Sequence, residues 1–154
     1  MKEQLVETCH INNRINLMLL DKITGEGMKS TLSTRGGRTV AEQFTHIHNV
    51  RLMWLEICAP DIFKKHKKLD KAKAQNKKLL KKAFYESAKA IAEVISRSVD
   101  EGKVKGFKRG VVAMLGYFIA HEAHNRGSIL LTLKQCGHKI DQQTQYGIWE
   151  WEKI

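Results

Sequence analysis

Histidines are the residues of this chain with the clearest potential for chemistry, because four of the seven lie in two small clusters. His46 and His48 form the first cluster, and His121 and His124 form the second. Residues two apart on a helix point to nearly opposite sides, whereas residues three or four apart share a face. On the helix of the first cluster, one stripe looks more interior than the stripe that carries His48 and Arg51, and it consists of Gln43, His46, Val50, Met53 and Ile57. We therefore expect His46 in the interior and His48 at the edge of its helix.

Imidazoles from two helices that meet inside a bundle are a known way to hold a metal ion. Neutral imidazole suits zinc, nickel, copper or iron. His121 shares a helix face with both His124 and Asn125, so either residue could join His46 and His121 as a third ligand. Three ligands leave a position open for water, whose pKa zinc lowers to about 7. The alternative is that the histidines are bonded to neighbouring backbone or acidic groups, or are exposed.

Four stretches with helical apolar periodicity are available to position these side chains, over residues 2–22, 39–58, 76–100 and 109–136. No alternating pattern typical of strands competes with them. The sequence therefore predicts an all-α fold, a four-helix bundle that forms one domain over residues 1–154.

The segments between these helices also carry information. Residues 60–75 are numerous enough to run the length of a bundle, so the helices on either side of them can be parallel. Gly137 stands where a glycine commonly ends a helix. Trp149 and Trp151 predict that the C-terminal tail, residues 138–154, docks on the bundle.

The formal net charge of +11 is concentrated in one segment, where ten lysines lie between Lys64 and Lys82. Such a run could follow a phosphate backbone. It contains no arginine to read bases and few aromatic residues to stack on them. We therefore interpret it as a solvated loop and helix start, and we do not expect nucleic acid to be the partner.

The three cysteines, Cys9, Cys58 and Cys136, are far apart and form no CxxC pair, so we expect buried or half-buried thiols. Polar residues interrupt every apolar run near the N-terminus, unlike a secretory signal. No stretch reaches the roughly 20 apolar residues of a membrane span. We expect a cytoplasmic protein with no membrane association.

Two segments resemble the signatures of the DinB-like (DinB/YfiT-like) family. The stretch from Phe44 to Leu55 is similar to its second helix, in which a histidine precedes a tryptophan by eight residues, here His46 and Trp54. The stretch from His121 to Ile129 is similar to the second signature of the family, in which a histidine is followed by the sequence His-His-Arg-Gly-Gln. The ending from Tyr146 to Trp151 also resembles family endings.

The resemblance implies a bundle in the order up-down-down-up, a homodimer, and a divalent metal, often nickel or zinc, at three histidines. Two of them map to His46 and His121, whereas the third maps to Asn125 and the family glutamine maps to Ser128. An asparagine oxygen is a weak ligand for zinc or nickel. Either the site is weakened, or His124 substitutes, or the metal has been lost.

The same resemblance implies a divalent-metal-dependent enzyme that is similar to a thiol transferase or to a hydrolase. Relatives of this fold include transferases that use a metal to activate a low-molecular-weight thiol. The alternatives are a non-catalytic member with a degenerate metal site and a basic nucleic-acid-binding protein. Arg126 either binds an acidic substrate or pairs with a carboxylate of residues 39–58 or the tail. We interpret Gly127 as allowing close approach of helices. We expect Glu122 to face another side of the helix from His121, so we assign it no role.

Overall fold

In the computed structural model, which describes residues 1–154, the chain folds into helices and contains no strand. The long helices are α1 (Lys2–Lys22), α3 (Val40–Cys58), α5 (Lys77–Glu101) and α6 (Gly110–Gln135), and the short ones are α2 (Gly25–Lys29), α4 (Pro60–Phe63) and α7 (Gln142–Gly147). Single 3-10 turns lie at Lys71–Lys73 and Trp151–Lys153. The predicted all-α class is confirmed, and each of the four predicted stretches agrees with a long helix to within one residue.

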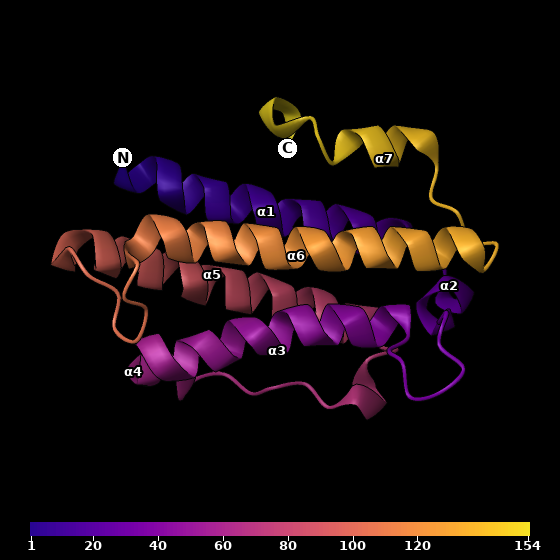
Figure 1. Ribbon diagram of the computed structural model, residues 1–154, viewed down its shortest axis with the longest axis horizontal. Coiled ribbons are helices and arrows are strands. Elements are labelled where there is room, and N and C mark those ends of the chain that lie inside the picture. The colour runs from indigo at the N-terminus through magenta and orange to yellow at the C-terminus, as the bar shows by residue number, and fades with distance from the viewer.

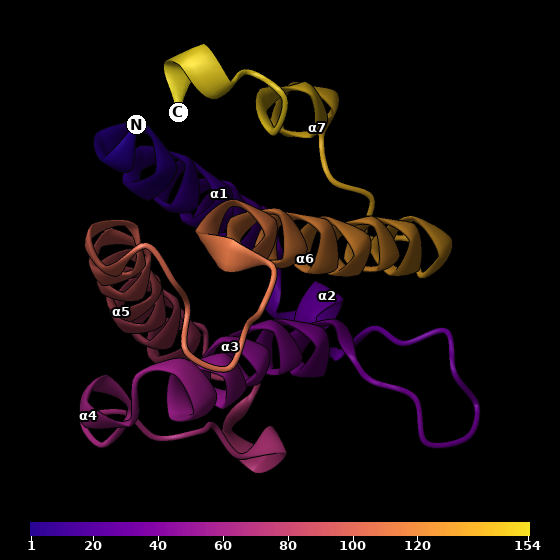
Figure 2. The same cartoon turned by 60° about the vertical axis from the view of Figure 1, so that its left-hand side comes forward.

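The long helices lie side by side, and Figure 1 shows their directions. Helices α1 and α6 run from left to right in that view, whereas α3 and α5 run from right to left. The chain between α4 and α5 returns along α3, so that α5 begins at the same end of the molecule as α3. Figure 2 shows the four helices surrounding a common interior.

Local sequence signals explain where the site-bearing helices begin and end. Helix α3 starts with a capping box, in which the Thr39 hydroxyl accepts from the Glu42 backbone N–H and the Glu42 carboxylate accepts from the Thr39 N–H. At the end of α6, Gly137 has φ +81°, and the N–H of His138 donates to the carbonyl of Leu133 at 2.8 Å. This is the Schellman arrangement. The residue after the helix takes a left-handed backbone conformation in it, which glycine adopts at the lowest cost.

The apolar core consists of two clusters of 14 buried residues each. One cluster includes Leu52 and Leu55 from the second half of α3, and the other includes Phe44 and Ile47 from the first half. Polar residues of the middle of each long helix lie between the two clusters. The bundle therefore has an apolar half at each end and a polar layer in its centre.

The tail returns over α1, as Figure 1 shows for α7. A side chain at Gly147 would meet the Met18 thioether at 3.7 Å, and Arg14 donates to the backbone oxygen of Ile154 at 3.2 Å. Trp151 is half-buried, but Trp149 is 78% exposed. The tail therefore docks, although only one of the two predicted tryptophan anchors packs against the bundle.

Two side chains of α3 hold the lysine-rich connection: Glu56 accepts from the Lys68 ammonium group at 2.9 Å, and Asn49 bonds to the backbone of Leu69. Asn49 donates to the carbonyl of Leu69 at 3.0 Å and accepts from its N–H at 2.9 Å. Most lysines of the run are exposed, as expected for a solvated segment. Lys77 differs, because its ammonium group donates to the carbonyl of Ile23 at 2.7 Å and thus stabilises the chain after α1.

Two further sequence expectations concern cysteines and membranes. Cys9 is buried, and Cys58 and Cys136 are partly buried free thiols, as predicted. None of the helices combines the length and the apolar character that crossing a membrane requires.

Replacing Thr39 by Ala is expected to lower the free energy of unfolding by about 1 kcal/mol, because the substitution removes the cap of α3. Urea denaturation followed by circular dichroism measures the change. Thr34→Ala is the matched control, since Thr34 is exposed and its hydroxyl makes no hydrogen bond. Equal stability of the two variants would show that the capping box contributes nothing.

Candidate metal centre and the buried polar layer

The side chains of His46 and His121 meet between α3 and α6. Their Nε2 atoms lie 3.3 Å apart, and the ring centroids are separated by 5.2 Å with the planes inclined at 63°. The ring of Tyr117 stacks on His121, with centroids 5.9 Å apart and planes inclined at 12°. The two imidazoles predicted to converge are therefore brought together, one from each helix.

The distance between the two Nε2 atoms suits two ligands of one metal ion. Zinc bound tetrahedrally at about 2.0–2.1 Å from each nitrogen places two ligand nitrogens about 3.3–3.4 Å apart. Burial lowers the pKa of both histidines below the usual value, and the charge of Arg38 adds to the effect at His46. Both imidazoles are therefore neutral near pH 7, the form that binds a metal.

Asn125 occupies the third position but does not present a ligand atom. Its Nδ2 donates to the carbonyl of His121 at 2.8 Å and lies 3.4 Å from the His121 Nε2. The nitrogen of the amide, which has no free electron pair for a metal, thus faces the histidine pair. His124 is exposed and makes no hydrogen bond to either imidazole. The structure supplies two imidazole ligands, and nowhere do three or more His, Cys, Asp or Glu side chains form a potential metal site.

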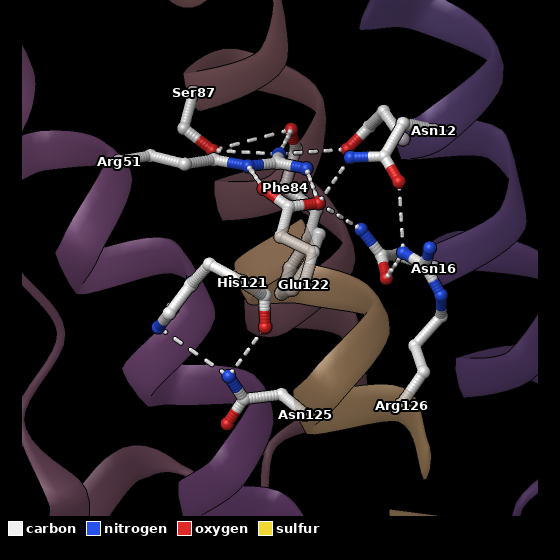
Figure 3. Close-up of polar contacts among 10 residues, drawn as sticks. Asn12, Asn16, Arg51, Phe84, Ser87, His121, Glu122, Asn125 and Arg126 are labelled. Carbon is white, nitrogen blue, oxygen red and sulfur yellow. Dashed lines mark hydrogen bonds and ion pairs between the residues drawn. The ribbon is translucent and has the colours of Figure 1, made fainter. Parts of the chain in front are cut away.

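Behind the histidine pair, the centre of the bundle is occupied by a buried ion pair (Figure 3). Arg51 of α3 donates to both carboxylate oxygens of Glu122 on α6, from Nε at 2.6 Å and from Nη2 at 2.8 Å. Glu122 Oε2 also accepts from Asn12 at 2.7 Å and from Asn16 at 2.6 Å. Arg126 in turn donates from Nη1 to the side-chain oxygens of both asparagines, each at 2.9 Å.

The remaining contacts of Arg51 extend this layer to α5. Its Nη1 donates to Asn13 at 2.8 Å, to the hydroxyl of Ser87 at 3.3 Å and to the carbonyl of Phe84 at 3.3 Å. The guanidinium also lies 5.0 Å from the centroid of the Phe84 ring. All four long helices are therefore joined through Arg51 and Glu122. The side chain of Arg51 is 4% exposed and that of Glu122 is 1% exposed.

Comparison with known protein families gives one match. The sequence model of the DinB family matches residues 1–152. The chain belongs to the DinB family. No curated protein and no solved structure matches it significantly. The family assignment predicted from the histidine signatures is thus confirmed, while DinB membership alone assigns neither a reaction nor a metal.

The structure corrects the predicted interior face of α3. His48, expected at the edge, is 3% exposed, whereas His46, expected in the interior, is half-buried. Arg51, expected on the same outer face as His48, is buried as well. Met53 and Ile57, expected inside, are exposed. The prediction failed because it treated a charged residue as a marker of the surface, whereas the Glu122 carboxylate neutralises Arg51 inside the bundle.

Glu122, to which the sequence assigned no role, lies at the centre of the polar layer. The sequence signal that could have found the layer is a set of polar residues at helical spacing. Asn12 and Asn16 are four apart in α1, and Glu122 and Arg126 are four apart in α6. Each pair shares a helix face. In this member of the DinB family, Arg126 pairs with the asparagines of α1 and not with a carboxylate of α3 or the tail.

Removing one partner of the central pair, with Glu122→Gln or Arg51→Met, is expected to lower the free energy of unfolding by about 3–5 kcal/mol, because an uncompensated charge remains buried. The double variant Arg51→Met/Glu122→Leu is expected to be more stable than either single variant. Chemical denaturation measures all three proteins. Purely additive losses in the double variant would contradict a direct coupling of the two charges.

The stability of the protein is expected to depend on pH through His48. Burial lowers the pKa of His48 to about 4, whereas in the unfolded chain it is about 6.5. The unfolded state therefore binds a proton first as the pH falls, so the free energy of unfolding decreases from about pH 6.5 to about pH 4, by up to about 3 kcal/mol. His48→Leu should reduce this slope, and the exposed His124→Asn should not. Identical pH profiles of His48→Leu and wild type would contradict the assignment.

Proposed function

We propose that this member of the DinB family is a divalent-metal-dependent enzyme whose metal, nickel or zinc, is held by His46 and His121. The observation that carries the proposal is the 3.3 Å separation of two neutral Nε2 atoms contributed by different helices. When bound, such a metal supplies a Lewis acid that lowers the pKa of a coordinated water or thiol. The order of the long helices in Figure 1 supports an up-down-down-up bundle as the scaffold.

A polar pocket beside the histidine pair supports a small polar substrate. The pocket has a volume of about 310 Å³ and is lined by Asn125, His124 and Ser128 of α6 together with Gln43 of α3 and Arg38. The Oε1 atom of Gln43 is buried and has no hydrogen-bond partner in the protein. Because an unpaired buried acceptor is costly, a ligand that donates a hydrogen bond would stabilise it.

The residues of this pocket would bind and orient such a substrate. Arg38 supplies a positive charge for a carboxylate, and Ser128 supplies a hydroxyl that both donates and accepts. A low-molecular-weight thiol that carries carboxylate and amide groups has this chemistry. We therefore favour thiol transfer over hydrolysis as the reaction class. The thiol group would approach the histidine pair past Asn125, which lines the pocket and lies next to His121.

Metal titration of untagged protein by isothermal calorimetry tests the first step. We expect one site for Ni²⁺ or Zn²⁺, and we expect His46→Ala and His121→Ala each to weaken it at least about tenfold, which corresponds to about 1.4 kcal/mol. His124→Ala is the matched control and should leave the affinity unchanged. Asn125→His should tighten binding, because it adds the third imidazole. Binding below about a tenth of an equivalent would contradict the proposal and favour a non-catalytic protein with a degenerate site.

A second measurement separates thiol chemistry from hydrolysis. In protein loaded with Co²⁺, addition of glutathione should produce the near-ultraviolet charge-transfer band of a cobalt–thiolate bond, since a coordinated thiol is deprotonated. S-methylglutathione should not produce it. Absence of the band with a correctly loaded metal would exclude the thiol as substrate while leaving metal binding intact.

We also include in this proposal the homodimer that the DinB resemblance implies and the cytoplasmic location expected from the sequence. Sedimentation equilibrium measures the first, and subcellular fractionation measures the second. A monomer across the micromolar range would contradict the dimer.

A further inference from the structure

A second pocket lies on the opposite side of α6, between that helix and the tail. Its volume is about 200 Å³, and its walls are mostly apolar, with Ile119 and Leu130 from α6 and Ile148 and Trp151 from the tail. Arg126 is the one charged residue that lines it. The pocket shares no lining residue with the histidine pair or with the polar pocket beside it.

Arg126 has hydrogen-bond donors to spare. It is 7% exposed, and its Nη1 donates to Asn12 and Asn16. Its Nε and Nη2 groups make no hydrogen bond within the protein, and Figure 3 draws the contacts of Arg126 with the asparagines. A guanidinium is never deprotonated near neutral pH and presents its donors as a planar fork suited to a carboxylate.

The polar layer is also short of one negative charge. It contains two buried guanidinium groups, from Arg51 and Arg126, but a single carboxylate, from Glu122. Cys9 does not supply the missing charge, because burial raises the pKa of its thiol to about 11. An uncompensated buried charge is costly. An anion bound at Arg126 would balance it.

Gly127 keeps the pocket open. It lies in the middle of α6 and lines the pocket, and a Cβ at this position would meet no atom within 4 Å. The expected close approach of helices at Gly127 is therefore wrong. Glycine weakens a helix interior, and no packing contact here explains its presence. The missing side chain instead leaves room beside Arg126.

We propose that this pocket binds a small apolar carboxylic acid, with its carboxylate on the Nε and Nη2 groups of Arg126 and its apolar body against Trp151 and Ile148. A cavity of about 150 Å³ can take up benzene, so the volume suits one ring or a short branched chain. The apolar walls lower the local polarity and so strengthen charged hydrogen bonds to Arg126. The site is independent of the proposed metal centre.

Titration with phenylacetate tests the proposal, with the neutral phenylacetamide as the matched ligand. Tryptophan fluorescence and the backbone amide signals of Gly127 and Ile148 in ¹H–¹⁵N spectra give the readout. We expect saturable binding of phenylacetate, at least about tenfold tighter than that of phenylacetamide, because one ligand carries the charge that pairs with Arg126. Equal binding of the two ligands, or no binding of phenylacetate, would overturn the proposal.

A pair of variants tests the location without disturbing the polar layer. Gly127→Leu fills the pocket and should weaken phenylacetate binding at least about tenfold. Gly116→Leu is the control, because Gly116 is another exposed glycine of α6 with no atom within 4 Å of its Cβ position. Unchanged binding by Gly127→Leu would overturn the proposal. Dissociation of a dimer by Gly127→Leu alone would also overturn it, since a second copy would then cover the pocket.

Discussion

The buried pair of Arg51 and Glu122 is the interaction on which the rest of the structure depends. Its charges lie in the polar layer between the two apolar clusters, and its hydrogen bonds reach all four long helices. Two apolar clusters alone would tolerate sliding of one helix past another. The bidentate pair instead fixes the register of α3 against α6, a role that buried polar groups perform in some proteins. His121 precedes Glu122 directly, and His46 lies on the same helix as Arg51. The pair that fixes α3 against α6 thereby also fixes the distance between the two imidazoles.

The two sides of α6 face different pockets. Towards α3, His121 and Asn125 face His46 and a polar pocket. Towards α1 and the tail, Arg126 and Gly127 face an apolar pocket. The two sides share the polar layer but none of their lining residues, so each can bind its own ligand. Membership of the DinB family agrees with the all-helical scaffold. The amide of Asn125 beside His121 and the open volume beside Gly127 are features that the structure of this chain shows.

Sequence periodicity predicted the four long helices because their apolar faces, caps and terminal glycines are local signals. Periodicity left open whether His46 and His121 would meet, and the resemblance to the DinB signatures is what paired them; the structure brings the two half-buried rings together. Periodicity failed at Arg51 and Glu122 because the burial of each charge depends on a partner 71 residues away, which polar residues at helical spacing do not identify. It failed at His48 because Arg51 was taken to mark the outer face of that helix. Likewise, the carbonyl of His121 sets the orientation of the Asn125 amide. Arg126 donates hydrogen bonds to asparagines of α1. Such choices depend on tertiary contacts, which a single sequence does not display.

The central claim is that the polar layer holds two imidazoles at the spacing of one metal ion. Crystals of the untagged protein grown with Ni²⁺, measured on both sides of the nickel absorption edge, test it directly. The account predicts a single anomalous peak within about 2.0–2.2 Å of Nε2 of both His46 and His121, close to the distances known for imidazole ligands. A peak bound to other side chains, or histidine rings turned apart with no nickel between them, would contradict it.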